Sequence, residues 1–341
     1  MDGIIKNQNL GPLNTFRLKS SAEYYCRVSD RSLLKNALKF ARDRDLAINV
    51  IAGGSNVILP ESLPGITLQI DTRGISYGPE EGKVVVAAGE NWHSFVIDTI
   101  DHGLSGLENL SLIPGCVGAA PIQNIGAYGV EFANVFESLS ALDIETGQWV
   151  TFDKSECRFS YRESIFRGSS KYIIASVTLL LDTVFHPKLD YPGVLEALKN
   201  EKVLLPTAKQ VSEAICSVRR EKLPDPLKLP NVGSFFKNPV ISRDRFLMLR
   251  DQFPNLIGWE QPEGAVKISA AAVLEQMGLK GVSVGDAAVS TQHSLVIVNH
   301  GNATSTQVLD LAAKIQDEVR EKCEVQLELE PTVLPLRWVF S

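Results

Sequence analysis

The segment from Asn231 to Pro239 reads NVGSFFKNP and gathers a hydroxyl, an ammonium and an amide around two phenylalanines. Phenylalanine side chains favour burial, whereas lysine and asparagine side chains require water or a polar partner. A serine beside a glycine, here Ser234, is most often a turn or helix-cap hydroxyl. The segment could instead form a polar wall set against a small apolar block. The segment alone leaves both interpretations open.

Two glycine-rich stretches could bind a ligand through the backbone. The first, Gly53-Gly54-Ser55-Asn56, follows an expected strand. Glycine lets the chain approach a ligand closely, and successive N–H groups can face a phosphate. The stretch lacks the Gly-x-Gly-x-x-Gly spacing that opens a helix, so a Rossmann fold is not indicated. A plain tight turn is the commoner use of such residues.

The second stretch runs from Pro114 to Gly129 and reads PGCVGAAPIQNIGAYG. Its small residues leave little side-chain bulk, which suits a tight backbone wall against something large and flat. Its polar side chains, Gln123, Asn124 and Tyr128, could contact the edge of a heterocycle. The alternative is a small-residue loop inside a crowded domain.

Charged candidates come from two further places. The guanidinium of Arg162 can fork onto a carboxylate. A surface ion pair with the adjacent Glu163 is the alternative, and the residues alone favour it. Residues 325–330 read VQLELE, and this alternation predicts a strand with Glu328 and Glu330 on one face. Such a polar face is by default solvated.

Composition limits the class of protein. The chain has 341 residues, of which 44% are hydrophobic and 22% charged, and its net charge is −6. The length predicts two or three domains, and the charge argues against nucleic-acid binding. No apolar run approaches the ~20 residues that span a bilayer. The five cysteines and five histidines are scattered without metal or disulfide spacing. We therefore expect a metal-free protein of the reducing cytoplasm, and a monomer.

The hydrophobic pattern predicts an α+β protein. Helices are expected over residues 32–41, 92–102, 211–221, 270–277 and from 305 onward, with Ser32 and Ser305 as N-caps. Strands are expected over residues 48–51, 57–59, 83–88, 172–177 and 294–298. Prolines and a glycine break the pattern at 187 and 192–193, so a linker or boundary is expected within 183–205.

Six motifs in order carry a resemblance to a known family. They are NTFR at 14–17, GGSN at 53–56, Gly89, the stretch at 114–129, YRESIF at 161–166 and GSFFKNP at 233–239. Together they closely resemble the UDP-N-acetylenolpyruvoylglucosamine reductases, flavoenzymes of bacterial peptidoglycan precursor synthesis. The likeness covers residues 12–330, and its two long motifs are highly specific.

The resemblance implies a fold and a domain order. An FAD-binding domain of the vanillyl-alcohol-oxidase (PCMH) type would occupy residues 1–185, as two α+β subdomains divided near residue 72. A linker or insertion at 186–204 would lead to an α+β substrate-binding domain at 205–341. The insertion looks like that of one family subtype, in which a tyrosine, here Tyr191, closes over the substrate.

The resemblance also implies a reaction. Hydride from NADPH would pass through non-covalent FAD to the CH2 carbon of UDP-N-acetylglucosamine enolpyruvate, giving UDP-N-acetylmuramate for the cell wall. Ser55 stands where relatives with tethered FAD often carry a histidine. Arg162 and Glu330 would stabilise the enolate, and Ser234 would donate the proton. Pro331 and the tail after it depart from the family pattern, so Glu328 is a second candidate for the carboxyl.

Two sets of binding residues follow from the same resemblance. Those for the cofactor are Gly53, Gly54, Ser55, Asn56, Gly115, Gly118, Ala119, Gln123, Asn124, Gly126, Ala127 and Tyr128. Those for the substrate are Tyr191, Lys222, Asn238 and His293, and lysine is a suitable point charge for a diphosphate.

Two other functions remain as alternatives at this point. One is a flavin oxidase of the same fold that acts on a hydroxyl substrate. The other is a catalytically inactive flavin- or nucleotide-binding protein, which the altered tail favours.

Overall fold

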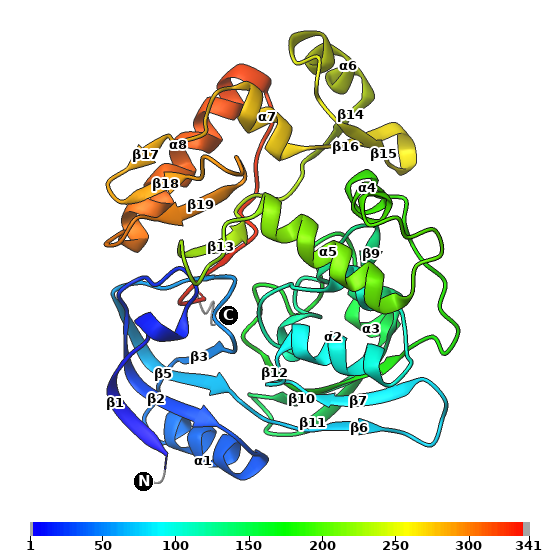
Figure 1. The fold of residues 1–341 in the computed structure, drawn as a ribbon. Coiled ribbons are helices and arrows are strands. Elements are labelled where there is room, and N and C mark those ends of the chain that lie inside the picture. The colour runs from blue at the N-terminus through cyan, green and yellow to red at the C-terminus, as the bar shows by residue number, and fades with distance from the viewer. Residues whose placement is uncertain (1–2, 337–341) are drawn as a thin grey trace.

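The computed structural model describes residues 3–336, and its first lobe is a four-stranded sheet in the order β1-β2-β5-β3 (Figure 1). Strand β1 is antiparallel to β2, whereas β5 is parallel to both β2 and β3. The elements of this lobe are β1 (Ile4–Asn9), β2 (Ser21–Val28), α1 (Arg31–Arg42), β3 (Ile48–Ile51), β4 (Val57–Ile58) and β5 (Ser62–Ile70).

The cap of α1 differs from the prediction. The carboxylate of Asp30 accepts the backbone N–H groups of Ser32 and Leu33, so Asp30 is the N-cap and Ser32 lies inside the first turn. An ionised cap carries full charge toward the helix N-terminus, which a serine hydroxyl does not. The prediction of Ser32 as the cap was therefore wrong by two positions.

The second lobe is an antiparallel five-stranded sheet in the order β11-β10-β12-β7-β6. Its buried side chains join those of the first lobe in one hydrophobic core. The elements are β6 (Ile75–Tyr77), β7 (Lys83–Ala87), α2 (Trp92–Asp101), β8 (Gly126–Ala127), β9 (Val130–Glu131), β10 (Phe136–Asp143), β11 (Trp149–Asp153), α3 (Lys154–Cys157) and β12 (Tyr172–Leu180).

Two helices pack on the second lobe after the sheet ends. Helices α4 (Pro192–Asn200) and α5 (Ala208–Lys222) share a small core with Phe185 and Tyr128 of that lobe. The buried hydroxyls of Ser111 and Ser212 lie 2.7 Å apart and join α5 to the same lobe. The chain therefore changes lobe after α5, later than residue 205, where the sequence analysis began the substrate-binding domain.

The third lobe contains an antiparallel four-stranded sheet, in the order β13-β19-β18-β17, and a smaller three-stranded sheet. The smaller sheet, in the order β14-β16-β15, lies beside α6. The elements are β13 (Asn231–Ser234), β14 (Val240–Ser242), α6 (Arg243–Gln252), β15 (Gly258–Glu260), β16 (Ala265–Ile268), α7 (Ala270–Gln276), β17 (Ser283–Val284), β18 (Ala287–Val289), β19 (Val296–Asn299) and α8 (Ser305–Cys323).

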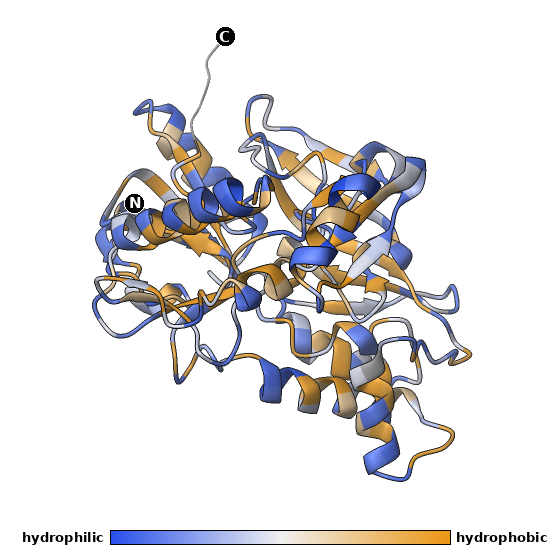
Figure 2. Cartoon of the chain, turned by 90° about the horizontal axis from the view of Figure 1, so that it is seen from above, coloured by the Kyte–Doolittle hydropathy of each residue, from blue (hydrophilic) through white to orange (hydrophobic). Residues whose placement is uncertain are grey.

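Helix α8 covers the larger sheet of the third lobe with one apolar face. The helices carry hydrophilic and hydrophobic residues along the same ribbon, as expected for elements that are buried on one side only (Figure 2). The N-cap is Thr304 rather than the predicted Ser305, because Thr304 and Gln307 satisfy each other's backbone N–H groups.

The chain then returns to the first lobe, where β20 (Thr332–Val333) pairs in parallel with β4. The continuous strand predicted at 325–330 is wrong, since only Leu329 forms a bridge, with Phe236. Two backbone hydrogen bonds flank that bridge, from Lys237 N–H to Glu328 and from Glu330 N–H to Phe235. The partner segment soon reaches Pro239, which has no N–H to extend a ladder. Within residues 3–336 no helix could span a membrane.

Candidate active site

One cleft between the lobes brings together Arg162, Ser234 and Glu330. They come from the second lobe, the end of β13 in the third lobe and the segment that returns to the first lobe. The two glycine-rich stretches supply much of the remaining lining. A guanidinium, a hydroxyl and a carboxyl thus face one space although they are far apart in the sequence.

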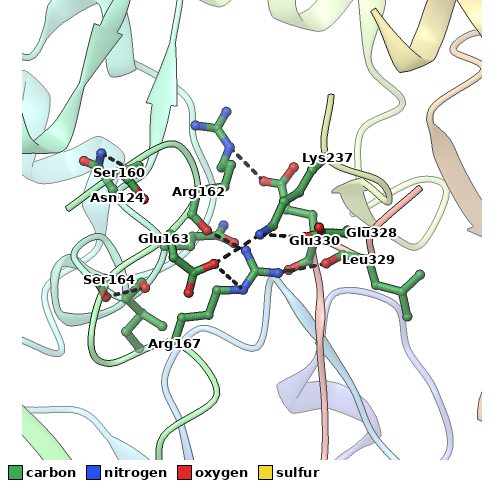
Figure 3. A network of polar contacts seen from close by, with 12 residues as sticks. Asn124, Ser160, Arg162, Glu163, Ser164, Arg167, Lys237, Glu328, Leu329 and Glu330 are labelled. Carbon is green, nitrogen blue, oxygen red and sulfur yellow. Dashed lines mark hydrogen bonds and ion pairs between the residues drawn. The ribbon is translucent and has the colours of Figure 1, made fainter. Parts of the chain in front are cut away.

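The guanidinium of Arg162 is directed at the carboxyl of Glu330 (Figure 3). Its Nε donates to Glu330 Oε1 at 3.2 Å, and its Nη2 donates to the carbonyl of Gly126 at 2.6 Å. Only 18% of the side chain is exposed. The alternative of a surface pair with Glu163 is therefore wrong, since Glu163 pairs with Lys237 at 3.2 Å.

The two candidate glutamates lie in different surroundings. The side chain of Glu328 is 69% exposed and pairs with Lys237, whereas that of Glu330 is 13% exposed and lines the cleft. Burial raises the pKa of Glu330, while Arg162 and Arg167 oppose that rise. A raised pKa favours the neutral acid, which can donate a hydrogen bond. The residue pattern predicted that both side chains face solvent, and in the structure only that of Glu328 does.

Ser234 reaches the cleft because of the residues beside it. Gly233 adopts a φ of +75°, a conformation that glycine accepts without strain, and its N–H donates to Asn231 Oδ1 at 2.8 Å. The rings of Phe235 and Phe236 are fully buried in the core of the third lobe. The turn and the two anchored rings leave the serine at the lining of the cleft.

The glycine-rich stretches form a wall of the cleft in which Gly54 and Gly118 have no room for a side chain. A Cβ on Gly54, whose φ is +60°, would lie 2.0 Å from the carbonyl oxygen of Leu13, and one on Gly118 would lie 2.5 Å from Ala88 Cβ. Asn56 Nδ2 donates to Gln123 Oε1 at 2.9 Å and joins the two stretches. The predicted cofactor residues that line the cleft are Gly53, Gly54, Ser55, Asn56, Gly118, Ala119, Gln123 and Gly126.

The other four predicted cofactor residues, Gly115, Asn124, Ala127 and Tyr128, lie outside the described lining of the cleft. The side chain of Asn124 is buried, accepts the N–H of Ala133 at 2.9 Å and donates to Glu131 and Ser160. It therefore holds neighbouring loops together. The ring of Tyr128 packs edge-on against Tyr191, with centroids 4.9 Å apart.

The four predicted substrate residues are not among the described residues that line the cleft. The Nζ of Lys222, at the end of α5, lies 5.7 Å from the ring centroid of Tyr191. Asn238 accepts the N–H of Ala270 at 3.0 Å through its side chain. Burial and the charge of nearby Lys280 lower the pKa of His293, which favours a neutral ring.

Arg219 also lines the cleft, and the sequence analysis missed it. It lies on α5, and its buried Nε has no hydrogen-bond partner among residues 3–336. A single arginine on an amphipathic helix is an ordinary feature, so the sequence carried no signal for it. A buried donor without a partner requires an acceptor from a ligand or water.

The comparisons with known proteins agree with this geometry. Residues 225–334 match the family model of the UDP-N-acetylenolpyruvoylglucosamine reductase C-terminal domain. A UDP-N-acetylenolpyruvoylglucosamine reductase of Pseudomonas putida is 45% identical over 329 residues, which are 95% of this chain and 97% of the relative. The chain belongs to the UDP-N-acetylenolpyruvoylglucosamine reductase family.

Solved structures extend the comparison to the fold. The reductase of Thermus caldophilus superimposes with a TM-score of 0.67 and 26% identity, covering 97% of this chain and 98% of that one. The 6-hydroxy-D-nicotine oxidase of Arthrobacter nicotinovorans shares the fold at a TM-score of 0.55 and 12% identity, over 96% and 87% of the two chains. Residues 22–153 match an FAD binding domain. The predicted family, fold class and FAD cofactor are confirmed.

The residues of the cleft fit FAD. Small residues of both stretches line the cleft, and such residues let a flat ring system or a diphosphate approach the backbone closely. The unpartnered Nε of Arg219 offers a donor for a carbonyl or phosphate oxygen. Residues 53–56, the residues of the second stretch that line the cleft and Arg219 would therefore hold the cofactor of the reductase.

Gly118→Ala should weaken FAD binding, because the added methyl would collide with Ala88 at the back of the wall. We expect a loss of stability of about 1–3 kcal/mol, the usual cost of overpacking, and a lower flavin content. Flavin absorbance per protein and thermal unfolding measure the two effects. Gly78→Ala is the control, since a Cβ there makes only ordinary contacts, the shortest 3.5 Å. Equal flavin content in both variants would contradict the assignment.

Proposed function

We propose that this chain reduces UDP-N-acetylglucosamine enolpyruvate to UDP-N-acetylmuramate, with NADPH as the electron source, for peptidoglycan synthesis. The observation that carries the proposal is the convergence of Arg162, Ser234 and Glu330 on a cleft with a glycine wall. Bound FAD would supply the hydride, taken from NADPH, for the CH2 carbon of the substrate. The residues described next control where the resulting charge and proton go.

Arg162 and Glu330 act on the carboxylate of the enolpyruvyl group. Arg162 binds it as a permanent cation, and neutral Glu330 donates a hydrogen bond to it. When hydride adds to the CH2 carbon, negative charge develops on the neighbouring carbon and spreads into that carboxylate. Donors already directed at this charge stabilise the transition state without reorganising. The raised pKa of Glu330 supports the role, because an ionised carboxylate would repel the enolate.

Ser234 completes the addition by donating its hydroxyl proton to the carbon next to the new CH3 group. A serine hydroxyl is a weak acid, so it can act only on a strong base such as the developing carbanion. Hydride and proton together saturate the double bond. The serine oxygen then regains a proton from solvent, and the enzyme is ready for another substrate.

Lys222→Ala should raise KM for the substrate about tenfold or more while kcat changes little, because a charge-assisted hydrogen bond to the diphosphate is worth about 1.5–3 kcal/mol. The position of Lys222 beside Tyr191 supports a joint role in binding. Steady-state kinetics separate the two constants. Lys209→Ala, an exposed lysine at the other end of α5, is the control and should leave KM unchanged. An unchanged KM for Lys222→Ala would remove it from the substrate site.

Following NADPH loss with and without the enolpyruvyl UDP-sugar tests the function directly. Consumption only with the sugar supports the reductase, and consumption coupled to oxygen alone supports the oxidase alternative. Bound flavin without turnover supports the inactive protein. We place the reaction in the cytoplasm, since the five cysteines are free. The monomer stays a prediction that size-exclusion chromatography can test.

A further inference from the structure

Arg167 contacts the backbone of both residues assigned to the enolate, Arg162 and Glu330 (Figure 3). Its Nη1 donates to the carbonyl of Arg162 at 2.6 Å. Its Nη2 donates to the carbonyl of Leu329 at 2.8 Å and to that of Glu330 at 3.3 Å. One guanidinium therefore joins the loop that carries Arg162 to the returning segment that carries Glu330.

This link adds to the contacts that hold each residue separately, which are the bond from Arg162 to the carbonyl of Gly126 and the bond from the N–H of Glu330 to the carbonyl of Phe235. Arg162 and Glu330 are 168 residues apart, and one hydrogen bond of 3.2 Å connects their side chains. Arg162 also has a φ of +54°, a conformation in which a non-glycine residue is strained and needs support from its surroundings. A donor on its carbonyl oxygen supplies such support. The same guanidinium also donates to the carbonyls of Leu329 and Glu330, in the segment that carries the other member of the pair.

We propose that Arg167 is a positioning residue that sets the distance and orientation between Arg162 and Glu330 by binding the carbonyl oxygens of both. The proposal rests on the roles given above to those two residues. A guanidinium suits this place because it directs several N–H groups along fixed, diverging lines. A lysine ammonium at this place keeps the charge but cannot hold two separate backbones in one fixed geometry.

An ionic cluster holds Arg167 in turn. Glu163 Oε2 lies 3.9 Å from Arg167 Nε and 3.2 Å from Lys237 Nζ. Lys237 also pairs with Glu328 at 3.1 Å and has only 13% of its side chain exposed. Because Lys237 follows Ser234 by three positions in the third lobe, the cluster connects Arg167 to the segment that carries the proton donor. The segments that carry Arg162, Glu330 and Ser234 are thus connected through Arg167.

Arg167→Lys tests position separately from charge. We expect kcat per bound flavin to fall about 10- to 100-fold, the scale of a misplaced catalytic group, while NADPH still reduces the flavin at the original rate. The alkaline limb of the pH profile should stay in place, because the charge that lowers the pKa of Glu330 is retained. Arg167→Gln, which removes the charge, should slow kcat as well and move that limb to higher pH.

Arg245→Lys is the matched control. The Nε of Arg245 donates to the backbone carbonyl of Cys323 at 2.9 Å, and its side chain is 20% exposed, but it is not among the described residues that line the cleft. We expect it to lower the unfolding temperature without changing kcat per bound flavin. The proposal would be overturned if Arg167→Lys keeps the wild-type kcat per bound flavin, whether or not its unfolding temperature falls as expected for Arg245→Lys.

A double-mutant cycle distinguishes this proposal from the function on which it rests. If Arg167 acts through Glu330, Arg167→Lys in a Glu330→Gln background should slow kcat by less than about threefold more. Substrate affinity of the oxidised enzyme, measured by calorimetry, should show the same lack of additivity. Fully additive losses would refute a role through Glu330. A normal rate for Glu330→Gln alone would instead refute the catalytic role of Glu330, and the role of Arg167 with it. The proposed function itself fails only if the wild-type protein shows no NADPH loss that depends on the enolpyruvyl UDP-sugar.

Discussion

Ser234→Ala is expected to slow the oxidation of reduced flavin by the enolpyruvyl substrate about 10²- to 10⁴-fold, the usual contribution of a general acid. Reduction of the flavin by NADPH should keep its rate, because the hydroxyl acts only on the substrate carbon. The backbone of Ser234 pairs with Val296 through β13 and β19, and alanine can keep that pairing. Anaerobic stopped-flow absorbance measures the two half-reactions separately.

Ser294→Ala is the control for the loss of a serine hydroxyl in the same lobe. Its Oγ donates to the carbonyl of Ala271 at 2.7 Å, away from the described cleft lining. We expect Ser294→Ala to lower stability by about 1 kcal/mol, the net value of one hydrogen bond, and to leave both half-reactions unchanged. Loss of both half-reactions in Ser234→Ala would show a structural role for Ser234 instead of proton donation.

Glu330→Gln is expected to slow the same substrate-dependent step about 100-fold or more, because an acidic O–H donor is replaced by a weaker N–H donor at the developing charge. It should also remove the alkaline limb of the pH profile. Burial raises the pKa of Glu330 above its ordinary value, so the active neutral acid is present at low pH. It is lost as the pH rises through the raised pKa.

Glu328→Gln is the control for that change and decides between the two candidate carboxyls. Glu328 is exposed and pairs only with Lys237 among the described residues. Because surface ion pairs contribute little energy, we expect the rate of the Glu328→Gln variant to stay within about twofold of wild type. If the activity of the wild-type protein falls as the pH is lowered, the ionised form of Glu330 is the active one and the role given to the neutral acid is wrong. Equal losses in both variants would leave the assignment to Glu330 without support.

The family and much of the site could be predicted because their signals are local. Short motifs such as GGSN and GSFFKNP carry the turn residues and the small residues that a backbone wall requires. Helices with a clear hydrophobic period could also be predicted, and α2 and α7 occupy the expected ranges to within one residue. These features depend on neighbours a few positions away, which the sequence displays directly.

Other features depend on residues that are distant in the sequence. The alternation at 325–330 predicts a strand, but its partner segment ends at a proline and allows one bridge. Asn124 had the chemistry of a ligand contact, yet the fold uses its whole side chain to join loops. Arg167 and Arg219 resemble any other arginine until the lobes come together. Their surroundings arise only from tertiary packing.

The order of the contributing segments along the chain has a consequence for biosynthesis. The glycine wall comes from residues 53–56 and 118–126, whereas Ser234 and Glu330 follow much later. A ribosome therefore delivers every part of that wall before it delivers the proton donor or the acid. The first stretch of the wall is followed directly by β4, whose partner β20 is synthesised near the end of the chain, so the wall is completed only when the acid is also in place.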